Sequence, residues 1–407
     1  MTLLKNPLQT FKNFSFAYAP QILQMGLGLL STYYLVRWLS QENYGHYQFL
    51  LSFIGLLTLT NLKGLNNATM QSVARGHIGT YIHAVKLSFF SSLLGSLALL
   101  IGAVYFHYQE EGSGLAQAAL FCALLFPFAH GLTQWKSVAT GREHFGKLFA
   151  SEGTVVVLTA SGIVAATFFL NPLFLYALLI VLSVPSFINI WMTVRNLRLF
   201  ASETKTSEDN IAYGLKTSFF LGFQSISTNI DKMLIFFFLS PVAVAIYAVS
   251  ERLASMLRSI VQKFLLVIAP RYARLEKYSD DLNKEIFWFS AVIAVGLIIF
   301  AIFFLPPLVT FIFGEQYNES IIYAQLLTGA LAIGNVANFK FRFIRSRLDT
   351  KNYGIVIVST SLLKICASAT LTFFFGLIGT VISEYIYRIG FVIIVNAIIK
   401  RDYLESP

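Results

Sequence analysis

Long apolar runs separated by short polar ones dominate the chain, and the runs have the length of membrane helices. A bilayer core about 30 Å thick needs roughly 20 apolar residues per helix, and twelve segments fit that rule. The runs are continuous rather than alternating, so helices are the expected way to satisfy the backbone hydrogen bonds in lipid. The predicted helices are residues 14–38, 45–62, 84–107, 114–135, 148–170, 172–194, 213–239, 241–269, 286–313, 319–339, 354–375 and 377–399.

A polar segment separates the first six predicted helices from the last six. It runs from Ser202 to Asn210, within the longest connection on its side of the membrane. We therefore expect an all-α integral membrane protein with an N-terminal six-helix lobe at 1–200, a cytoplasmic linker at 201–212 and a C-terminal six-helix lobe at 213–407. Because each lobe has six helices, both enter the membrane in the same sense, which predicts a parallel internal repeat around a central cavity.

Composition agrees with this picture, and the positions of the charges orient the chain. Only 12% of residues are charged, against about 25% in soluble domains. Twenty-three of the 30 lysine and arginine residues fall on one side of the predicted helices, the side that holds both termini. The positive-inside rule then makes both termini cytoplasmic. The net charge of +10 is explained by topology and anionic inner-leaflet lipid, and no nucleic-acid partner is expected.

Nine ionisable residues within the spans of the second half are the strongest functional signal. The bases are Lys232, Arg252, Arg258, Lys263, Lys364 and Arg388, and the acids are Asp231, Glu251 and Glu384. At 1.5 Å per residue, several lie about 10 to 16 Å inside the helix ends, near the bilayer midplane. Charged groups at that depth are costly and mark functional sites by default, so the sequence predicts a polar cavity in the C-terminal half.

A structural interpretation of the same charges stays open. Glu384 and Arg388 are four residues apart on one helix and could neutralise each other. Asp231 could pair with Arg252 across a helix interface. The bases nevertheless outnumber these nominal pairs, which favours an anionic guest or water in the cavity.

Neutral polar residues characterise the first two helices instead. The candidates are Gln24, Ser31, Gln48 and Ser52, which suit a hydroxyl-rich ligand. Hydrogen bonding between helices is an equally good explanation for such residues.

The sequence offers no arrangement typical of catalysis or metal binding. Residues 141–148 approach a nucleotide-binding P-loop, but Leu148 stands where a hydroxyl would bind magnesium. The histidines show no ligand spacing beyond His77 and His83, for which polar loop positions are the better interpretation. We predict no catalytic residues, no metal and no cofactor, and hence a protein that is not an enzyme.

Residues 29–47, LLSTYYLVRWLSQENYGHY, resemble the first hairpin of Wzx-type polysaccharide flippases, also called O-antigen flippases or polysaccharide biosynthesis proteins. In that family the first helix ends in Arg, a bulky apolar residue and Leu, before an acidic turn and Gly-x-Tyr. Residues 229–247 and 308–325 are similar to parts of the family's second half. The family belongs to the multidrug, oligosaccharidyl-lipid and polysaccharide exporter superfamily. Ala245 departs from the usual glycine, and the charge-poor first half departs from the lipid II flippase branch.

The resemblance implies a flippase of the bacterial inner membrane. By alternating access it would move polyprenyl-diphosphate-linked oligosaccharide to the outer leaflet, for O-antigen of lipopolysaccharide, capsule or exopolysaccharide. Its partners would be membrane lipid, the lipid-linked oligosaccharide, the polysaccharide polymerase with its chain-length machinery, and a proton or sodium ion. A cation-coupled small-molecule or multidrug exporter of the same superfamily is the alternative.

Residue roles follow from this implied substrate. A diphosphate needs charge-assisted donors, which Arg252, Arg258, Lys232, Lys364 and Arg388 would supply. Gln24, Ser31, Gln48 and Ser52 would contact the sugars. Asp231, Glu251 and Glu384 would couple transport to an ion, or would hold the bases in position.

Overall fold

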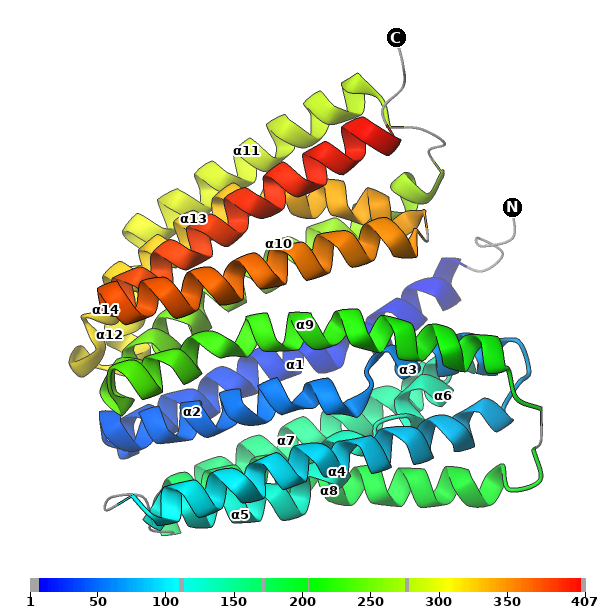
Figure 1. Cartoon of the computed structure of the whole chain (residues 1–407), viewed down its shortest axis with the longest axis horizontal. Coiled ribbons are helices and arrows are strands. Elements are labelled where there is room, and N and C mark those ends of the chain that lie inside the picture. The colour runs from blue at the N-terminus through cyan, green and yellow to red at the C-terminus, as the bar shows by residue number, and fades with distance from the viewer. Residues whose placement is uncertain are drawn as a thin grey trace. The chain divides into compact units, whose positions relative to one another are not determined.

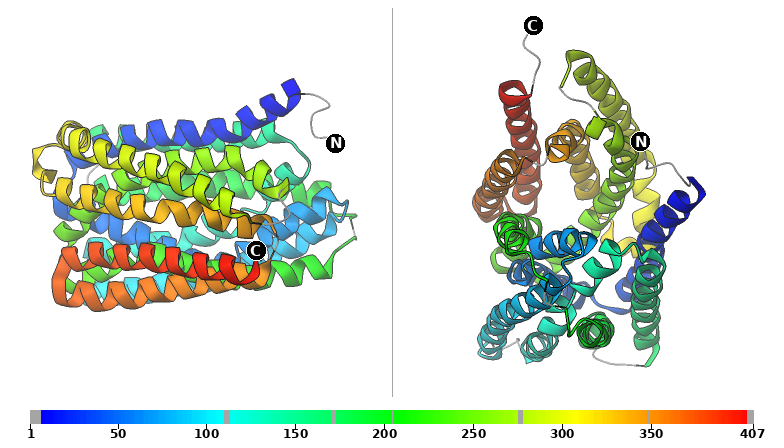
Figure 2. Two further views of the ribbon diagram at one scale, coloured as in Figure 1. Left: turned by 90° about the horizontal axis from the view of Figure 1, so that it is seen from above. Right: turned by 90° about the vertical axis from the view of Figure 1, so that its right-hand side faces the viewer.

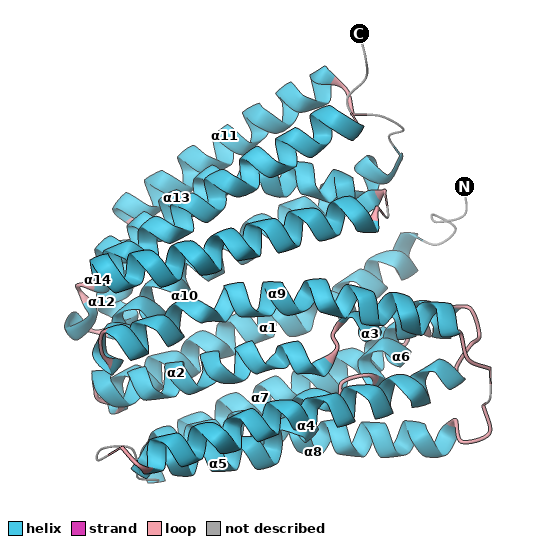
Figure 3. Ribbon diagram, in the orientation of Figure 1, coloured by secondary structure: helices cyan, strands magenta, loops and turns pink. Residues whose placement is uncertain are grey.

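The computed structural model consists of helices joined by short turns (Figures 1 and 3). It describes residues 7–109, 113–169, 173–203, 205–274, 278–347 and 349–403, with side chains described for all of these except 7–22, 113, 173 and 263–274. The extreme termini, predicted to be cytoplasmic, lie outside the described residues. The chain forms two compact units, residues 1–225 and 226–407.

The first unit is a bundle in which α1 packs along α7, and α4 along α5 (Figure 2). Its helices are α1 Pro7–Trp38, α2 Gln41–Leu57, the 3-10 helix η1 Thr58–Asn61, α3 Gly64–Ala74, α4 Gly79–His107, α5 Ser113–Phe126, the π-helical turn η2 Pro127–Gly131, α6 Trp135–Gly141, α7 Phe145–Phe169 and α8 Leu173–Leu199. Ile54, Leu99, Phe126 and Leu182 meet in its buried core. Four different elements thus supply one apolar centre.

Helix α9, Glu208–Phe238, crosses the division between the two units. Its first half belongs to the first unit, where the Ser218 hydroxyl accepts a hydrogen bond from the Gly64 amide at 2.9 Å. Asn210 donates its side-chain amide to the Ser72 hydroxyl at 2.7 Å. The compact units therefore divide inside a helix, whereas the predicted linker at 201–212 comes before it; that linker stays a prediction.

The second unit packs α13 against α10, α11 and α14. Its helices are α10 Pro241–Arg274, α11 Asp280–Phe303, α12 Leu305–Phe313, the 3-10 helix η3 Glu315–Tyr317, α13 Ser320–Ser346 and α14 Thr350–Asp402. Phe339 and Phe343 of α13 and Phe391 and Val395 of α14 form the buried core. This core holds the helices that carry the charged residues at fixed separations.

Helix α14 is a hairpin of two helical arms rather than one straight helix. Gly376 has φ 60° and ψ −139°, a conformation that L-residues with a side chain rarely adopt. The chain reverses there, so the residues on either side of Gly376 lie on facing helical arms. The predicted helices 354–375 and 377–399 place their boundary at this glycine.

The predicted spans fall on helices, but three contain breaks. The prediction 45–62 runs through the end of α2 and η1, the prediction 114–135 includes η2 from Pro127, and 286–313 crosses the junction of α11 and α12 before Pro306.

Seven helices of the described chain are long and apolar enough to span a membrane, or eight if the bent pair formed by α2–η1 and α3 is one span. Helices α9 and α10, which carry Asp231, Lys232, Glu251 and Arg258, are not among the seven. The count of twelve stays a prediction.

Candidate functional site: a charge cluster in the second unit

Lys364 lies at the centre of a cluster of ionisable residues in the second unit. Its Nζ is 3.0 Å from Asp231 Oδ2 on α9 and 2.8 Å from Glu384 Oε2 on the second arm of α14. All three side chains are at most 10% exposed. A buried lysine is tolerated when carboxylates neutralise it, and here one ammonium bridges two of them. We use "charge cluster" for these three residues together with Lys232, Glu251, Arg258 and Arg388.

Arg388 neutralises the other oxygen of Glu384. Its Nε and Nη2 donate to Glu384 Oε1 at 2.9 and 2.6 Å, one helical turn away on the same arm. The guanidinium also lies over the Tyr387 ring, 5.0 Å from its centroid. Gly334 on α13 makes room for it, since a Cβ there would lie 2.5 Å from Arg388 Cδ. The pairing of Glu384 with Arg388 that the four-residue spacing suggested is confirmed.

Hydroxyl groups complete the hydrogen bonding around Asp231. Tyr247 of α10 donates to Asp231 Oδ2 at 3.0 Å, and Ser368 of α14 donates to Asp231 Oδ1 at 2.8 Å. The Ser368 hydroxyl also lies 2.8 Å from the Ser383 hydroxyl on the facing arm. A buried carboxylate with donors on both oxygens stays in one orientation, so these hydroxyls fix the geometry of the cluster.

The remaining members form a more accessible rim. Lys232 Nζ and Glu251 Oε2 are 2.7 Å apart, with side chains 18% and 24% exposed. The Arg258 side chain is 32% exposed, and its Nη2 is 3.8 Å from Glu384 Oε1, much farther than Nη2 of Arg388 at 2.6 Å. Its Nε is buried without a hydrogen-bond partner among the described residues. Arg258 is therefore the least satisfied cation of the cluster.

The charge cluster has a positive surplus, because four bases face three acids. Each acid has at least one base within ion-pair distance. A net positive, partly buried site with an accessible arginine can accept an anion, and an arginine can present a fork of N–H donors to phosphate oxygens.

The structure does not bring every predicted residue into the cluster. Asp231 pairs with Lys364, so the suggested pairing of Asp231 with Arg252 is wrong; Arg252 is exposed and points from a neighbouring face of α10. Arg252 lies outside the cluster because residues 251 and 258 share one face of α10, whereas residue 252 is turned by about 100° from residue 251. The side chain of Lys263 lies outside the described residues.

Tyr247, Ser368 and Ser383 were missed by sequence reasoning, although a signal for the serine was present. Lys364, Ser368 and Thr372 repeat at a spacing of four along the first arm, and Thr380, Glu384 and Arg388 repeat the same spacing on the second. Two polar stripes on consecutive apolar helices indicate facing surfaces. Thr372 and Thr380 indeed meet at 2.8 Å, and Ser368 meets Ser383 beside the second stripe.

The predicted sugar-binding residues of the first unit differ in accessibility. Gln24 of α1 is exposed, and Gln48 of α2 is half-buried with its amide donating to the Tyr44 hydroxyl at 3.0 Å. Ser31 and Ser52 are buried, and the Ser31 hydroxyl donates to the Leu27 carbonyl of its own helix at 2.9 Å. Within the described chain, no group of three or more His, Cys, Asp or Glu residues could hold a metal ion.

Comparison with solved structures gives the class of the fold. The chain is similar to a multidrug-resistance MATE family transporter of the MOP superfamily in an inward-facing conformation, with TM-score 0.67, 12% identity, and coverage of 93% of this chain and 96% of that one. A MOP superfamily transporter from Pyrococcus furiosus, described as having a binding pocket of reverse polarity, has TM-score 0.66, 12% identity and 96% coverage of both chains. The lipid II flippase MurJ, in an inward closed conformation, has TM-score 0.65, 15% identity, and coverage of 95% and 87%. The chain thus shares the fold of these solved structures.

The sequence then identifies the family within this class. Residues 10–276 match the polysaccharide biosynthesis protein family, and the chain belongs to that family. No curated protein matches the sequence significantly. The resemblance noted from residues 29–47 and from the second-half stretches is confirmed at this level.

Proposed function

We propose that the protein is a flippase for polyprenyl-diphosphate-linked oligosaccharide, serving the assembly of a surface polysaccharide such as O-antigen, capsule or exopolysaccharide. The family supports the pathway, and the superfamily fold supports movement across a membrane. The observation that carries the proposal is the positive surplus of the charge cluster, with Arg258 accessible and weakly paired. A diphosphate carries the negative charge that would neutralise this positive surplus.

Arg258 is the primary diphosphate contact in this proposal. Its side chain is about one-third exposed, whereas Lys364 and Arg388 are paired with Asp231 and Glu384 at 3.0 Å or less. Lys232 stands at the same rim and can exchange Glu251 for phosphate. Lys364 and Arg388 add positive potential from behind, and Arg252 serves a part of the substrate outside the cluster. Gln24 and Gln48 are the accessible candidates for the sugar, while Ser31 and Ser52 require a different conformation.

The three acids position the bases in this proposal. Each of Asp231, Glu251 and Glu384 has a basic partner at 2.6 to 3.0 Å. A carboxylate that coordinates sodium or exchanges a proton during transport must first release such a partner. This arrangement favours an anionic substrate over the alternative of a cation-coupled multidrug exporter, which needs acids available to the cation.

A reconstituted flipping assay tests the proposal. Proteoliposomes containing a polyprenyl-diphosphate-linked oligosaccharide are monitored by the accessibility of the glycan to a membrane-impermeant glycosidase. We expect the wild-type protein to move the glycan, Arg258→Gln to lower the rate at least tenfold, and Arg258→Lys to retain an intermediate rate because charge remains while the fork is lost. The matched control Arg345→Gln changes an exposed arginine of α13 outside the cluster and should transport normally.

Two results would overturn the assignment. Wild-type rates in Arg258→Gln would remove the diphosphate contact from the cluster. Absence of glycan movement, combined with cation-dependent efflux of organic cations from the same vesicles, would establish the exporter instead. In cells, deletion of the gene should abolish the surface polysaccharide and leave its lipid-linked unit facing the cytoplasm.

A further inference from the structure

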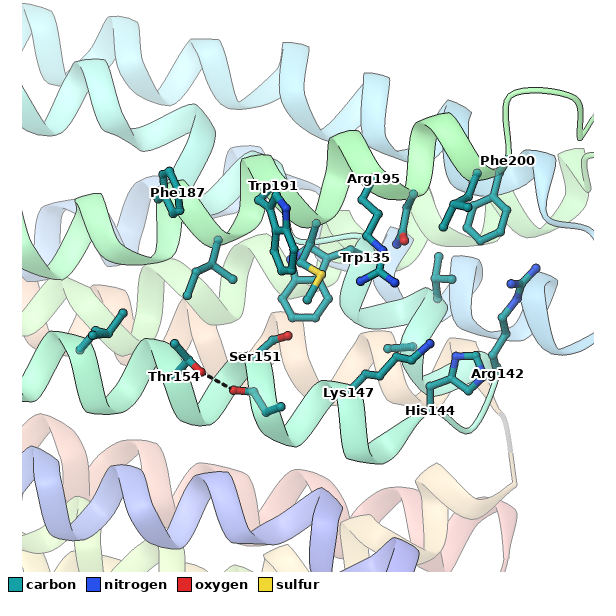
Figure 4. A pocket seen from close by; sticks show the side chains of 18 residues that line it. Trp135, Arg142, His144, Lys147, Ser151, Thr154, Phe187, Trp191, Arg195 and Phe200 are labelled. Atoms are coloured by element: carbon teal, nitrogen blue, oxygen red, sulfur yellow. Dashed lines mark hydrogen bonds between the residues drawn. The ribbon is translucent and has the colours of Figure 1, made fainter.

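The first unit contains a second cationic site, formed by residues that do not belong to the charge cluster. A cavity of about 620 Å³ opens between α6, α7 and α8. Its volume falls within the range of about 300 to 1,000 Å³ typical of ligand pockets. Figure 4 shows its lining, with Arg195 and Lys147 extending into the space between α8 and α7. We call it the basic pocket, after Arg142, Lys147 and Arg195.

The bases of this pocket lack acidic partners. None of the described residues lining the cavity is an aspartate or glutamate, and none of the three bases forms an ion pair with a described carboxylate. Glu152, one residue from the lining Ser151, pairs with Lys136 instead. Arg142 and Arg195 lie over the rings of Phe200 and Trp191, 4.4 and 5.9 Å from the centroids. Aromatic faces hold these guanidinium groups without neutralising them, so the positive charge remains available to an anion.

One wall of the pocket is apolar and exposed at the surface of the bundle. Leu158 of α7 and Phe187 and Trp191 of α8 line it, and they are 50%, 74% and 56% exposed. Trp135 closes the back: it is 2% exposed, and its indole N–H donates to Asn189 at 2.9 Å. Exposed aromatic and aliphatic side chains on a membrane helix face hydrocarbon. One end of the pocket is therefore suited to a lipid chain and the other to an anionic group.

We propose that the basic pocket binds an anionic phospholipid, with the headgroup phosphate on Arg142, Lys147 and Arg195 and an acyl chain along Leu158, Phe187 and Trp191. The three bases belong to loops and helix ends predicted to face the cytoplasm, at the level of inner-leaflet headgroups. Basic pockets between membrane helices on that side bind such headgroups. The start of α7 at Phe145 adds the positive end of its helix dipole to the same region.

The shape of the pocket argues for a lipid over a soluble anion. A small phosphate or a nucleotide would use the basic end and leave the exposed wall of Phe187 and Trp191 unfilled. A zwitterionic lipid would fill the wall but bring no net charge to three cations that form no ion pair with a described carboxylate. An anionic phospholipid satisfies both ends at once.

Tryptophan quenching in nanodiscs tests this inference. In a Trp38→Phe/Trp288→Phe background, two exposed tryptophans outside the pocket are removed, and the fluorescence of Trp135 and Trp191 reports on occupancy. The full-length protein is placed in phosphatidylcholine nanodiscs that contain, at equal mole fraction, either brominated phosphatidylglycerol or brominated phosphatidylcholine. We expect stronger quenching by the brominated phosphatidylglycerol, and a preference that falls about fivefold for each base removed in Lys147→Gln and Arg195→Gln.

The matched control is Arg198→Gln, which removes an exposed arginine from the same helix without touching the pocket. It should keep the full preference. Equal quenching by the two brominated lipids would overturn the proposal, as would unchanged preference in Lys147→Gln and Arg195→Gln. Loss of the preference on addition of millimolar inorganic phosphate, or displacement only by a polyprenyl diphosphate, would replace the phospholipid with a soluble anion or with the transported substrate.

Discussion

The charge cluster of the second unit and the basic pocket of the first unit use the same residue types in opposite ways. In the cluster, four bases face three acids and the central side chains are at most 10% exposed. In the pocket, three exposed bases face no acid among the described lining residues, and aromatic rings support them. A buried charge requires a partner of opposite charge within the protein, whereas a charge at the surface is solvated by water and remains available to a ligand. The charge cluster should therefore contribute to stability as well as to substrate binding, whereas the basic pocket should contribute to ligand binding alone.

The largest loss of stability in either region should come from Glu384→Gln in the charge cluster. This change leaves Lys364 with only Asp231 and leaves Arg388 without a described carboxylate. Removing one partner of a buried ion pair costs about 3 to 5 kcal/mol, so we expect a strong loss of thermal stability in detergent. The control is Glu319→Gln, an exposed acid of the same unit. Similar melting temperatures for the two variants would mean that water, rather than Glu384, neutralises the cluster.

A smaller loss should follow from Gly376→Ala, which changes the hairpin that brings the cluster together. A non-glycine residue in such a backbone region costs about 1 to 3 kcal/mol. Gly296 of α11 is the matched control, because a Cβ there meets nothing within 4 Å and its backbone is helical. Gly296→Ala should leave the melting temperature unchanged or raise it slightly. Equal effects at both glycines would show that the reversal does not need the conformation of Gly376.

The contribution of the rim pair, Lys232 and Glu251, to stability should lie between that of the buried ion pairs of the cluster and that of the exposed bases of the pocket. A double-mutant cycle with Lys232→Gln and Glu251→Gln should give a coupling of about 1 kcal/mol, measured by thermal or chemical unfolding. Both side chains are partly exposed, so the solvent weakens an interaction that is short at 2.7 Å. A coupling as large as the loss in Glu384→Gln would place this pair in the buried core instead.

The smallest effect on stability is expected for the basic pocket. Lys147→Gln combined with Arg195→Gln should change stability in detergent by no more than about 0.5 kcal/mol, because both side chains are exposed and unpaired with described carboxylates. The same double variant should lose the preference for anionic lipid. A large loss of stability in detergent alone would mean that these bases support the fold, and the contrast between the two regions would disappear.

The fold and the core of the cluster could be predicted from the sequence because both follow from strong local rules. Long apolar runs specify helices in lipid, and the depth of Asp231, Lys364, Glu384 and Arg388 along them specifies a shared layer. The pairing of Asp231 could not be predicted, since Arg252 and Lys364 lie at similar depth. Only the rotation of α10 and the hairpin at Gly376 decide which base faces the acid.

The basic pocket could not be predicted for a different reason. Arg142, Lys147 and Arg195 belong to loops and helix ends whose bases are already explained by topology, so nothing in their positions indicates a site. Their significance depends on the cavity between α7 and α8, which side-chain packing creates. The breaks at Pro127 and before Pro306 are likewise visible as prolines, but the sequence alone leaves open whether a helix bends or ends there.

The hairpin of α14 also bears on how the protein enters the membrane during synthesis. Its polar pairs are nested around Gly376: Thr372 with Thr380, Ser368 with Ser383, and Lys364 with Glu384. A lysine or an acid alone at the centre of a helix costs about 2.5 to 3.5 kcal/mol on insertion. Because Glu384 follows Lys364 by 20 residues on the facing arm, the two arms can leave the translocon as a closed hairpin in which this pair is already formed. Asp231 of α9 supplies the second acid for the two bases Lys364 and Arg388. The first neutralisation of Lys364 during insertion then depends on the turn at Gly376.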